Sequence, residues 1–104
     1  MSTMGQRLDL QTLLEGLLGT DKVYFQPPNG LAIEYPCIVY HQDNAVTEFA
    51  DNHPYRYTKR YQVTYMDTNP VSGIPDKIAQ LPMTLFNRFF PADNLNHFVF
   101  TLYF

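Results

Sequence analysis

Residues 85–104, LFNRFFPADNLNHFVFTLYF, carry the clearest structural pattern in this chain. Two aromatic-rich segments flank residues 91–94, where proline fixes φ and Asp93 and Asn94 tolerate a tight bend. Aromatic and β-branched residues on both sides of such a turn are typical of a β-hairpin. The sequence therefore predicts two antiparallel strands here. Their aromatic side chains must pack in the core of the chain or against another subunit.

Three more strands are expected upstream of this hairpin. Residues 55–66 alternate, with tyrosines prominent on one face and mainly polar residues on the other, which is the pattern of a long strand. Shorter strands are predicted at 23–26 and 35–41, and the first of them stops at residues 27–30, PPNG. Residues 43–54 show no strong period, so we expect them to form an acidic connection.

Two helices complete the expected fold. Leucines repeat with the spacing of one helical face over about 6–18, and Gly19 suits a C-terminal cap. A shorter helix is predicted at about 74–81, with Pro75 in its first turn and Pro82 after its end. The order α-β-β-β-α-β-β predicts a single α+β domain over residues 1–104. In such a domain both helices pack on one face of a mainly antiparallel sheet.

Composition narrows the function classes. The net charge of −3, from seven basic and ten acidic residues, disfavours a domain built to grip nucleic-acid phosphates. The single cysteine, Cys37, lies in an apolar segment, which predicts a small buried residue rather than a disulfide framework or a zinc site. No segment has the length of an apolar membrane span, and the first residues lack a signal peptide's hydrophobic region. We expect a soluble, intracellular protein.

Aromatic residues are unusually abundant. They make up 15% of the chain, as eight tyrosines and eight phenylalanines with no tryptophan. So many tyrosines exceed what a core of this size can bury, and tyrosine is favoured at protein interfaces. We interpret the surplus as surface that contacts another subunit.

Several residues have side chains suited to chemistry. His41 with Asp43 and Glu48 has the residue types of a metal site, but their spacing matches no recognised motif. His97 could act as a general base, although a strand histidine beside a turn more often has a hydrogen-bonded structural role. Cys37 has no basic neighbour in the sequence that would activate it as a nucleophile.

A cluster of basic residues lies among the tyrosines of the long strand. Arg56, Lys59 and Arg60 superficially suit single-stranded nucleic acid. The arginines alternate away from the tyrosines and the net charge is negative, so a solvated sheet face explains them better. The sequence also lacks a glycine-rich phosphate loop and a Ser-His-Asp pattern. We predict no catalytic residues, no metal and no cofactor, and favour a structural or interaction protein over an enzyme.

A family resemblance extends over most of the chain from about Leu14 onward. The stretches that carry it are 23–28 (VYFQPP), 35–40 (YPCIVY), 59–64 (KRYQVT), 74–78 (IPDKI) and, above all, 92–104 (ADNLNHFVFTLYF). They resemble the tail terminators of tailed phages and prophages, which are also called tail-completion or head–tail joining proteins. The likeness is one of the whole domain and includes no catalytic motif.

The resemblance implies a function based on shape. Tail terminators generally form a closed hexameric ring that caps the tail tube, stops its elongation and joins the tail to the head connector. The implied partners are further copies of the chain, the tail tube protein and the connector or stopper protein. The implied location is the neck of the virion, after assembly in the bacterial cytoplasm. Genome DNA passes through the lumen without sequence-specific binding.

The resemblance carries over no contact residues, so these are inferred from the sequence. We expect subunit or tube contacts at Phe49, Tyr55 and Tyr57, where the 43–54 connection meets the long strand. The alternative for Tyr57, and more so for Tyr61, is a place in the core beneath the helices.

Acidic residues in the same connection suggest a second role. Asp43, Glu48 and Asp51 are candidates for a loop facing the lumen, where negative charge repels DNA phosphates. The alternative is an ordinary solvated loop. Other functions also stay open at this point: a head-completion or stopper protein of the connector, a small binding module, or a small enzyme using His97 or His41.

Overall fold

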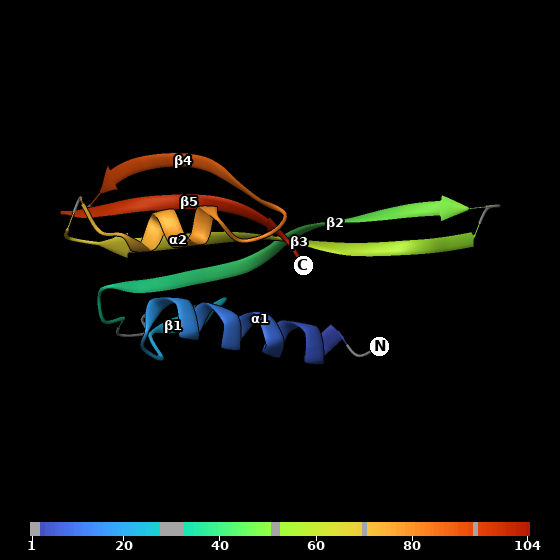
Figure 1. Cartoon of the computed structure of the whole chain (residues 1–104), viewed down its shortest axis with the longest axis horizontal. Helices are drawn as coiled ribbons and strands as arrows, with labels where there is room; N and C mark the ends of the chain where they lie inside the picture. The colour runs from blue at the N-terminus through green and yellow to red at the C-terminus, as the bar shows by residue number, and fades with distance from the viewer. Residues whose placement is uncertain (1–2, 28–32, 51–52, 70, 93) are drawn as a thin grey trace.

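The computed structural model describes residues 3–27, 33–50, 53–69, 71–92 and 94–104 (Figure 1). Over these residues the chain forms two helices and one five-stranded sheet. Their order is α1 (Thr3–Leu18), β1 (Val23–Phe25), β2 (Cys37–Ala50), β3 (His53–Asp67), α2 (Ile74–Ala79), β4 (Thr84–Ala92) and β5 (Leu95–Tyr103). The predicted α+β class and element order are confirmed.

The strands lie side by side in the order β1-β2-β3-β5-β4, so β1 and β4 form the two edges of the sheet. β1 pairs with β2 in parallel, and the other neighbouring strands are antiparallel. Within the terminal hairpin, pairing continues as far as Ala92 opposite Leu95. Pro91 therefore belongs to β4 and not to the turn. An edge strand tolerates it because the missing N–H need not face a partner strand.

The turn of this hairpin is shorter than the sequence suggested. Asn94 has a φ of 63°, in the left-handed region that asparagine tolerates better than most residues. Asp93, the other residue of the turn, lies outside the described residues.

The core lies between one face of the sheet and both helices. Leu10 and Leu14 of α1 and Ile78 of α2 are fully buried against it. The sheet contributes alternate residues of adjacent strands, as the pleat of a strand requires. These are Ile38 and Tyr40 of β2, Tyr61, Val63 and Tyr65 of β3, and Phe100 and Leu102 of β5. The core position considered for Tyr61 is therefore confirmed.

The sequence prediction of an acidic connection at 43–54 was wrong for the described residues 43–50 and 53–54, which form strands. β2 continues to Ala50 and β3 begins at His53, with the two strands paired along this length. Two register shifts interrupt the pairing: Asp43 is an extra residue on β2, and Tyr55 is an extra residue on β3. Each shift reverses the alternation of residues between the two faces, so the sequence shows no continuous period of two.

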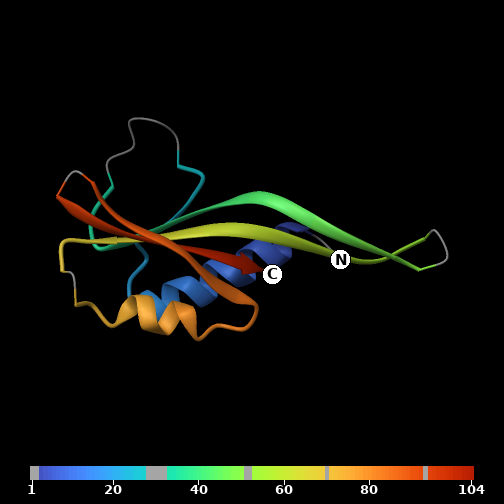
Figure 2. The ribbon, with the colours of Figure 1, turned by 90° about the horizontal axis from the view of Figure 1, so that it is seen from above.

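The strands β2 and β3 form a hairpin, and its distal part stands apart from the rest of the sheet. β1 pairs with β2 at residues 38–40, and β5 pairs with β3 from Arg60 to Asp67. Among the described residues, 44–50 of β2 pair only with β3, and 53–58 of β3 pair only with β2. We name these residues the hairpin arm. Figures 1 and 2 show the arm projecting well beyond both helices.

The arm gives the molecule its elongated shape. The principal dimensions are 51 × 24 × 24 Å. Residues 44–50, in extended conformation, span about 23 Å. The arm therefore accounts for nearly half of the long dimension.

Candidate interaction surfaces

Edge strand β4 carries a row of exposed apolar side chains. Leu85, Phe86 and Phe89 are 64%, 57% and 47% exposed, and Met83 just before the strand is also exposed. As an edge, this nine-residue strand presents backbone N–H and C=O groups that no strand of the described sheet pairs with. Such an edge is a ready site for contact with another chain.

A bulge places two of the phenylalanines on the same face. The register of β4 against β5 shifts between Phe86 and Arg88. As a result Phe86 packs on Phe100, with ring centroids 5.5 Å apart, and Phe89 packs on Phe98 at 4.9 Å. Both lie on the face that the helices cover elsewhere.

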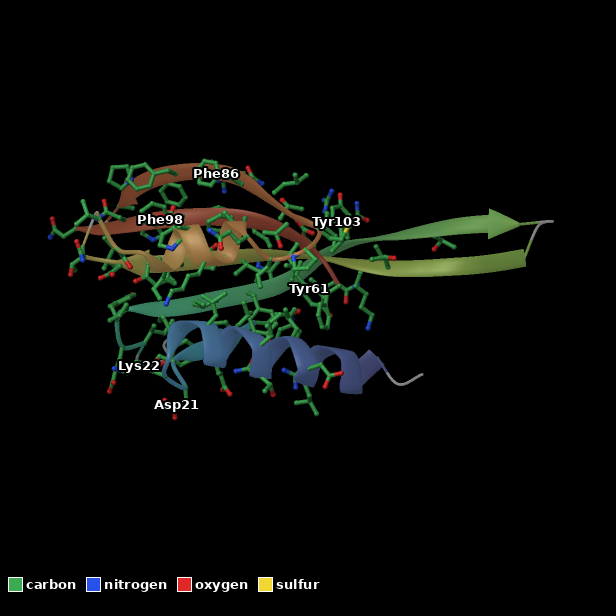
Figure 3. All side chains as sticks on the ribbon, viewed as in Figure 1. Asp21, Lys22, Tyr61, Phe86, Phe98 and Tyr103 are labelled. Atoms are coloured by element: carbon green, nitrogen blue, oxygen red, sulfur yellow. The ribbon has the colours of Figure 1, made fainter. Side chains whose placement is uncertain are left out.

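A groove of about 300 Å³ lies beside these rings, between α2 and β4. We name it the β4–α2 groove. Its lining residues are Pro75, Asp76 and Ala79 of α2, together with Phe86, Phe98 and Phe100. Figure 3 shows Phe86 and Phe98 on neighbouring strands, on the body of the molecule away from the arm.

The groove is open because α2 is short. A six-residue helix is about 9 Å long, whereas a nine-residue strand spans about 30 Å. α2 therefore covers only part of β4, and the outer faces of Phe86 and Phe89 stay in contact with solvent.

The contact residues predicted from the sequence all lie on the hairpin arm. In the backbone register Phe49 pairs with Pro54 and Tyr57 pairs with Thr47, and Tyr55 follows Pro54 on β3. The structure thus brings the three backbones together at the distal part of the arm. Their side chains lie outside what the structure describes, so their contact role stays a prediction.

The predicted acidic residues are distributed along the same arm. Glu48 pairs with Arg56 in the backbone register, although its side chain is not described. Asp51 lies outside the described residues. Asp43 lies at the base of the arm, where its Oδ1 accepts a hydrogen bond from Arg60 Nε at 2.9 Å.

The Asp43–Arg60 pair affects the electrostatics of the arm's base. Hydrogen bonds to Asp43 and then to Tyr103 raise the pKa of Arg60, because they favour the charged guanidinium. The carboxylate of Asp43 is thus partly neutralised by a neighbour. Its predicted place in a DNA-repelling lumen stays a prediction.

The histidine and cysteine candidates have structural surroundings. The ring of His97 stacks on Phe90, with centroids 4.6 Å apart and planes 11° apart, and its Nδ1 lies 3.3 Å from the Leu95 carbonyl oxygen. Cys37 is buried, as predicted, and burial raises the pKa of its thiol to about 11. In the part of the chain that the structure describes, no group of three His, Cys, Asp or Glu residues could hold a metal ion. None of the described helices is long and apolar enough to cross a membrane.

Sequence reasoning left open whether the terminal hairpin contacts another subunit and did not single out β4. It attributed the aromatic surplus to tyrosines, yet Tyr40, Tyr61 and Tyr65 are buried. The most exposed rings among the described residues are those of Phe86 and Phe89, followed by Tyr35 and Phe104. The available signal was the segment 85–90, LFNRFF, where the polar pair between two apolar pairs breaks a period of two. That pattern suits a bulged edge strand with apolar residues on both faces.

Comparison with known proteins adds no family to this description. Neither a scan against models of protein families nor a search of curated proteins finds a match to the chain. The likeness to tail terminators therefore stays a hypothesis that rests on the sequence stretches quoted above.

Proposed function

We propose that this protein is a structural component of a tailed phage or prophage particle, a tail terminator that assembles into a ring on the end of the tail tube. The observation that supports the proposal best is the presence of two separate, uncovered surfaces on one small domain. One is the hairpin arm, which projects from the body, and the other is the exposed aromatic edge at β4.

Two different surfaces on one chain are what a ring requires. In a ring each subunit offers one patch to the neighbour on its left and a different patch to the neighbour on its right. Such contacts close into a ring if the rotation between subunits permits, and otherwise continue as a filament. A closed ring of this kind acts by shape, because a capped tube has no site at which another tube subunit can add.

The charge of the chain suits the passage of DNA. With a net charge of −3, a ring of several copies carries a substantial negative charge. A negatively charged lumen repels phosphates, so DNA crosses it without adhering. The proposed partners are the tail tube protein on one side of the ring and the head connector or stopper protein on the other.

Electron microscopy of particles from a phage or prophage with this gene disrupted tests the proposal. A terminator leaves tails of uncontrolled length that fail to join heads, and a plasmid copy of the gene restores normal particles. Tails of normal length that still fail to attach favour instead a head-completion or stopper protein. Fully normal, infectious particles contradict both functions.

A further inference from the structure

We propose that the hairpin arm of one copy lies in the β4–α2 groove of the next copy, against Phe86 and Phe89. This inference rests on the self-assembly proposed above and goes beyond it by naming the two surfaces that meet. It differs from the sequence prediction because it identifies the receiving surface on β4, which the sequence left open between the core and another subunit.

The arm needs a partner to be stable as a ribbon. A two-stranded antiparallel hairpin alone in water is marginally stable, because it has no third strand or helix to cover it. Among the described residues the arm pairs with no other strand, and no residue of the core cluster lies within it. The side chains of Asn44 and Thr47 are exposed on it. Contact with another surface would supply the missing cover.

The β4–α2 groove needs a cover for the complementary reason. Phe86 and Phe89 have one side of each ring packed on β5 and the other exposed, next to an unpaired strand edge. Large apolar residues gathered on an exposed edge mark an interaction site, since monomeric proteins seldom leave them uncovered. The groove is therefore the surface on this chain best suited to receive an extended segment.

Geometry requires the two surfaces to belong to different copies. Figure 1 shows the arm continuing the strands β2 and β3 away from the body, and Figure 3 shows Phe86 on the body of the molecule, set back from the arm's base. An arm continuous with the sheet cannot fold back onto its own β4 without breaking that sheet. The arm length of about 23 Å also fits along β4, which spans about 30 Å.

The surface area of the chain supports a second copy as the occupant. The accessible area is 6623 Å², whereas a compact monomer of 12.1 kDa exposes about 6,000 Å². The excess is of the same order as the roughly 800 Å² that each partner buries in a standard interface. The contact joins unlike patches, so it leads to a ring or a filament rather than to a two-fold dimer.

A pair of variants on adjacent residues tests the groove. Phe86→Ser removes a ring that lines the groove, whereas Leu85→Ser removes a side chain that is more exposed and lies on the opposite face of β4. By light scattering we expect Phe86→Ser to lose the assembled species and Leu85→Ser to keep it. Circular dichroism and a thermal melt check that both variants fold.

Cross-linking identifies the contact without removing any apolar side chain. One tagged copy carries Thr47→Cys on the arm and a second copy carries Asp76→Cys in the lining of the groove, both at exposed positions. A short bismaleimide should join the two copies into a heterodimer. The matched control replaces Asp76→Cys by Asp21→Cys, beyond the end of α1, where we expect no cross-linked product (Figure 3).

The outcomes separate this inference from the proposed function. If the wild-type protein assembles but Phe86→Ser assembles equally well and no cross-link to Asp76→Cys forms, the arm docks elsewhere and self-assembly stands. If Phe86→Ser assembles normally but no longer binds the tail tube protein, the groove receives the tube and the inference is overturned. If the wild-type protein is monomeric at every concentration, both proposals fail.

Discussion

Tyr65 is the centre of a buried hydrogen-bond network at the end of β3. Its hydroxyl donates to Asp67 Oδ2 at 2.6 Å and lies 3.1 Å from Ser72 Oγ. The other carboxylate oxygen of Asp67 accepts the backbone N–H of Asn69 at 3.1 Å. Both Tyr65 and Asp67 are buried, so the network fixes the segment between β3 and α2 against the core.

Replacing Tyr65 with Phe should destabilise the protein. The substitution keeps the ring but leaves the buried carboxylate of Asp67 without its hydroxyl donor, which costs about 1–3 kcal/mol. Urea unfolding followed by circular dichroism measures the change. Tyr24→Phe is a matched control, because the Tyr24 hydroxyl forms no hydrogen bond with the residues that the structure describes, and we expect a change within about 0.5 kcal/mol. Equal losses in the two variants would contradict the role of the network.

The buried thiol of Cys37 and the buried hydroxyl of Tyr65 should make the stability of the fold sensitive to alkaline pH. Burial raises the pKa of the Cys37 thiol from 9.0 to about 11. Burial, followed by the hydrogen bond to Asp67, raises the pKa of Tyr65 from 10.0 to about 12. At a pH between the ordinary and the raised pKa of each group, the folded state holds a proton that the unfolded chain has released. The free energy of unfolding therefore falls as pH rises through this range.

Unfolding measured between pH 8 and 12 separates the two contributions. Compared with the wild type, Cys37→Ala should show a shallower loss of stability from pH 9 to about 11, and Tyr65→Phe from pH 10 to about 12. The pKa of Tyr40, which burial also raises, contributes equally to all three proteins. If Cys37→Ala retains the wild-type slope, the thiol keeps an ordinary pKa in the folded protein.

At the scale of elements, α1 is attached to the sheet by specific leucines. Leu14 is fully buried in the core, whereas the adjacent Leu13 is 39% exposed. Leu14→Ala should lower the free energy of unfolding by about 2–5 kcal/mol, because it leaves a cavity in the core. Leu13→Ala should cost less than about 1 kcal/mol. Denaturant titration of both variants measures the difference, and similar losses would mean that α1 packs by a different face.

The hairpin arm is an element whose removal should leave the body intact. Replacing residues 47–57 with Asn-Gly closes the strands at Val46 and Thr58, which already face each other in the register. The helices and the core residues are unchanged, so we expect a folded monomer with a native-like circular dichroism spectrum. A shortened protein that fails to fold would make the arm part of the folding unit. One that still assembles would remove the arm from the subunit interface.

Elements defined by a continuous local pattern could be predicted from the sequence. The leucine repeat identified α1, the alternation of residues 61–66 identified the core part of β3, and the turn residues identified the hairpin of β4 and β5. The distal part of β2 could not be identified in this way. The extra residue at Asp43 reverses its alternation, and it is a strand because it pairs with β3, not because of its own composition.

The candidate surfaces were predicted only in part for a related reason. The sequence indicated interface residues near Phe49 and Tyr55, which the structure places on the arm. It did not indicate Phe86 and Phe89, because their exposure depends on how much of β4 the short helix α2 covers. That is a tertiary property: the 85–90 segment indicates a bulged strand, but not how much of the strand a helix covers.

At the scale of the whole molecule, the shape is more extended than that of a compact domain. The radius of gyration is 14.8 Å, whereas a compact domain of 104 residues has about 13 Å. The excess reflects the arm, which extends the long axis to 51 Å. A chain of this size that holds a ribbon away from its core and leaves phenylalanines exposed on an edge has two surfaces that a neighbour could cover.

The mass of the purified wild-type protein in solution bears on self-assembly more directly than any variant does. Size-exclusion chromatography with light scattering should give an assembled species with a mass near six times the 12.1 kDa of the chain. Negative-stain micrographs of that species should show a ring with a central opening. A single species of 12.1 kDa at every concentration tested would contradict the proposal that this protein builds a ring.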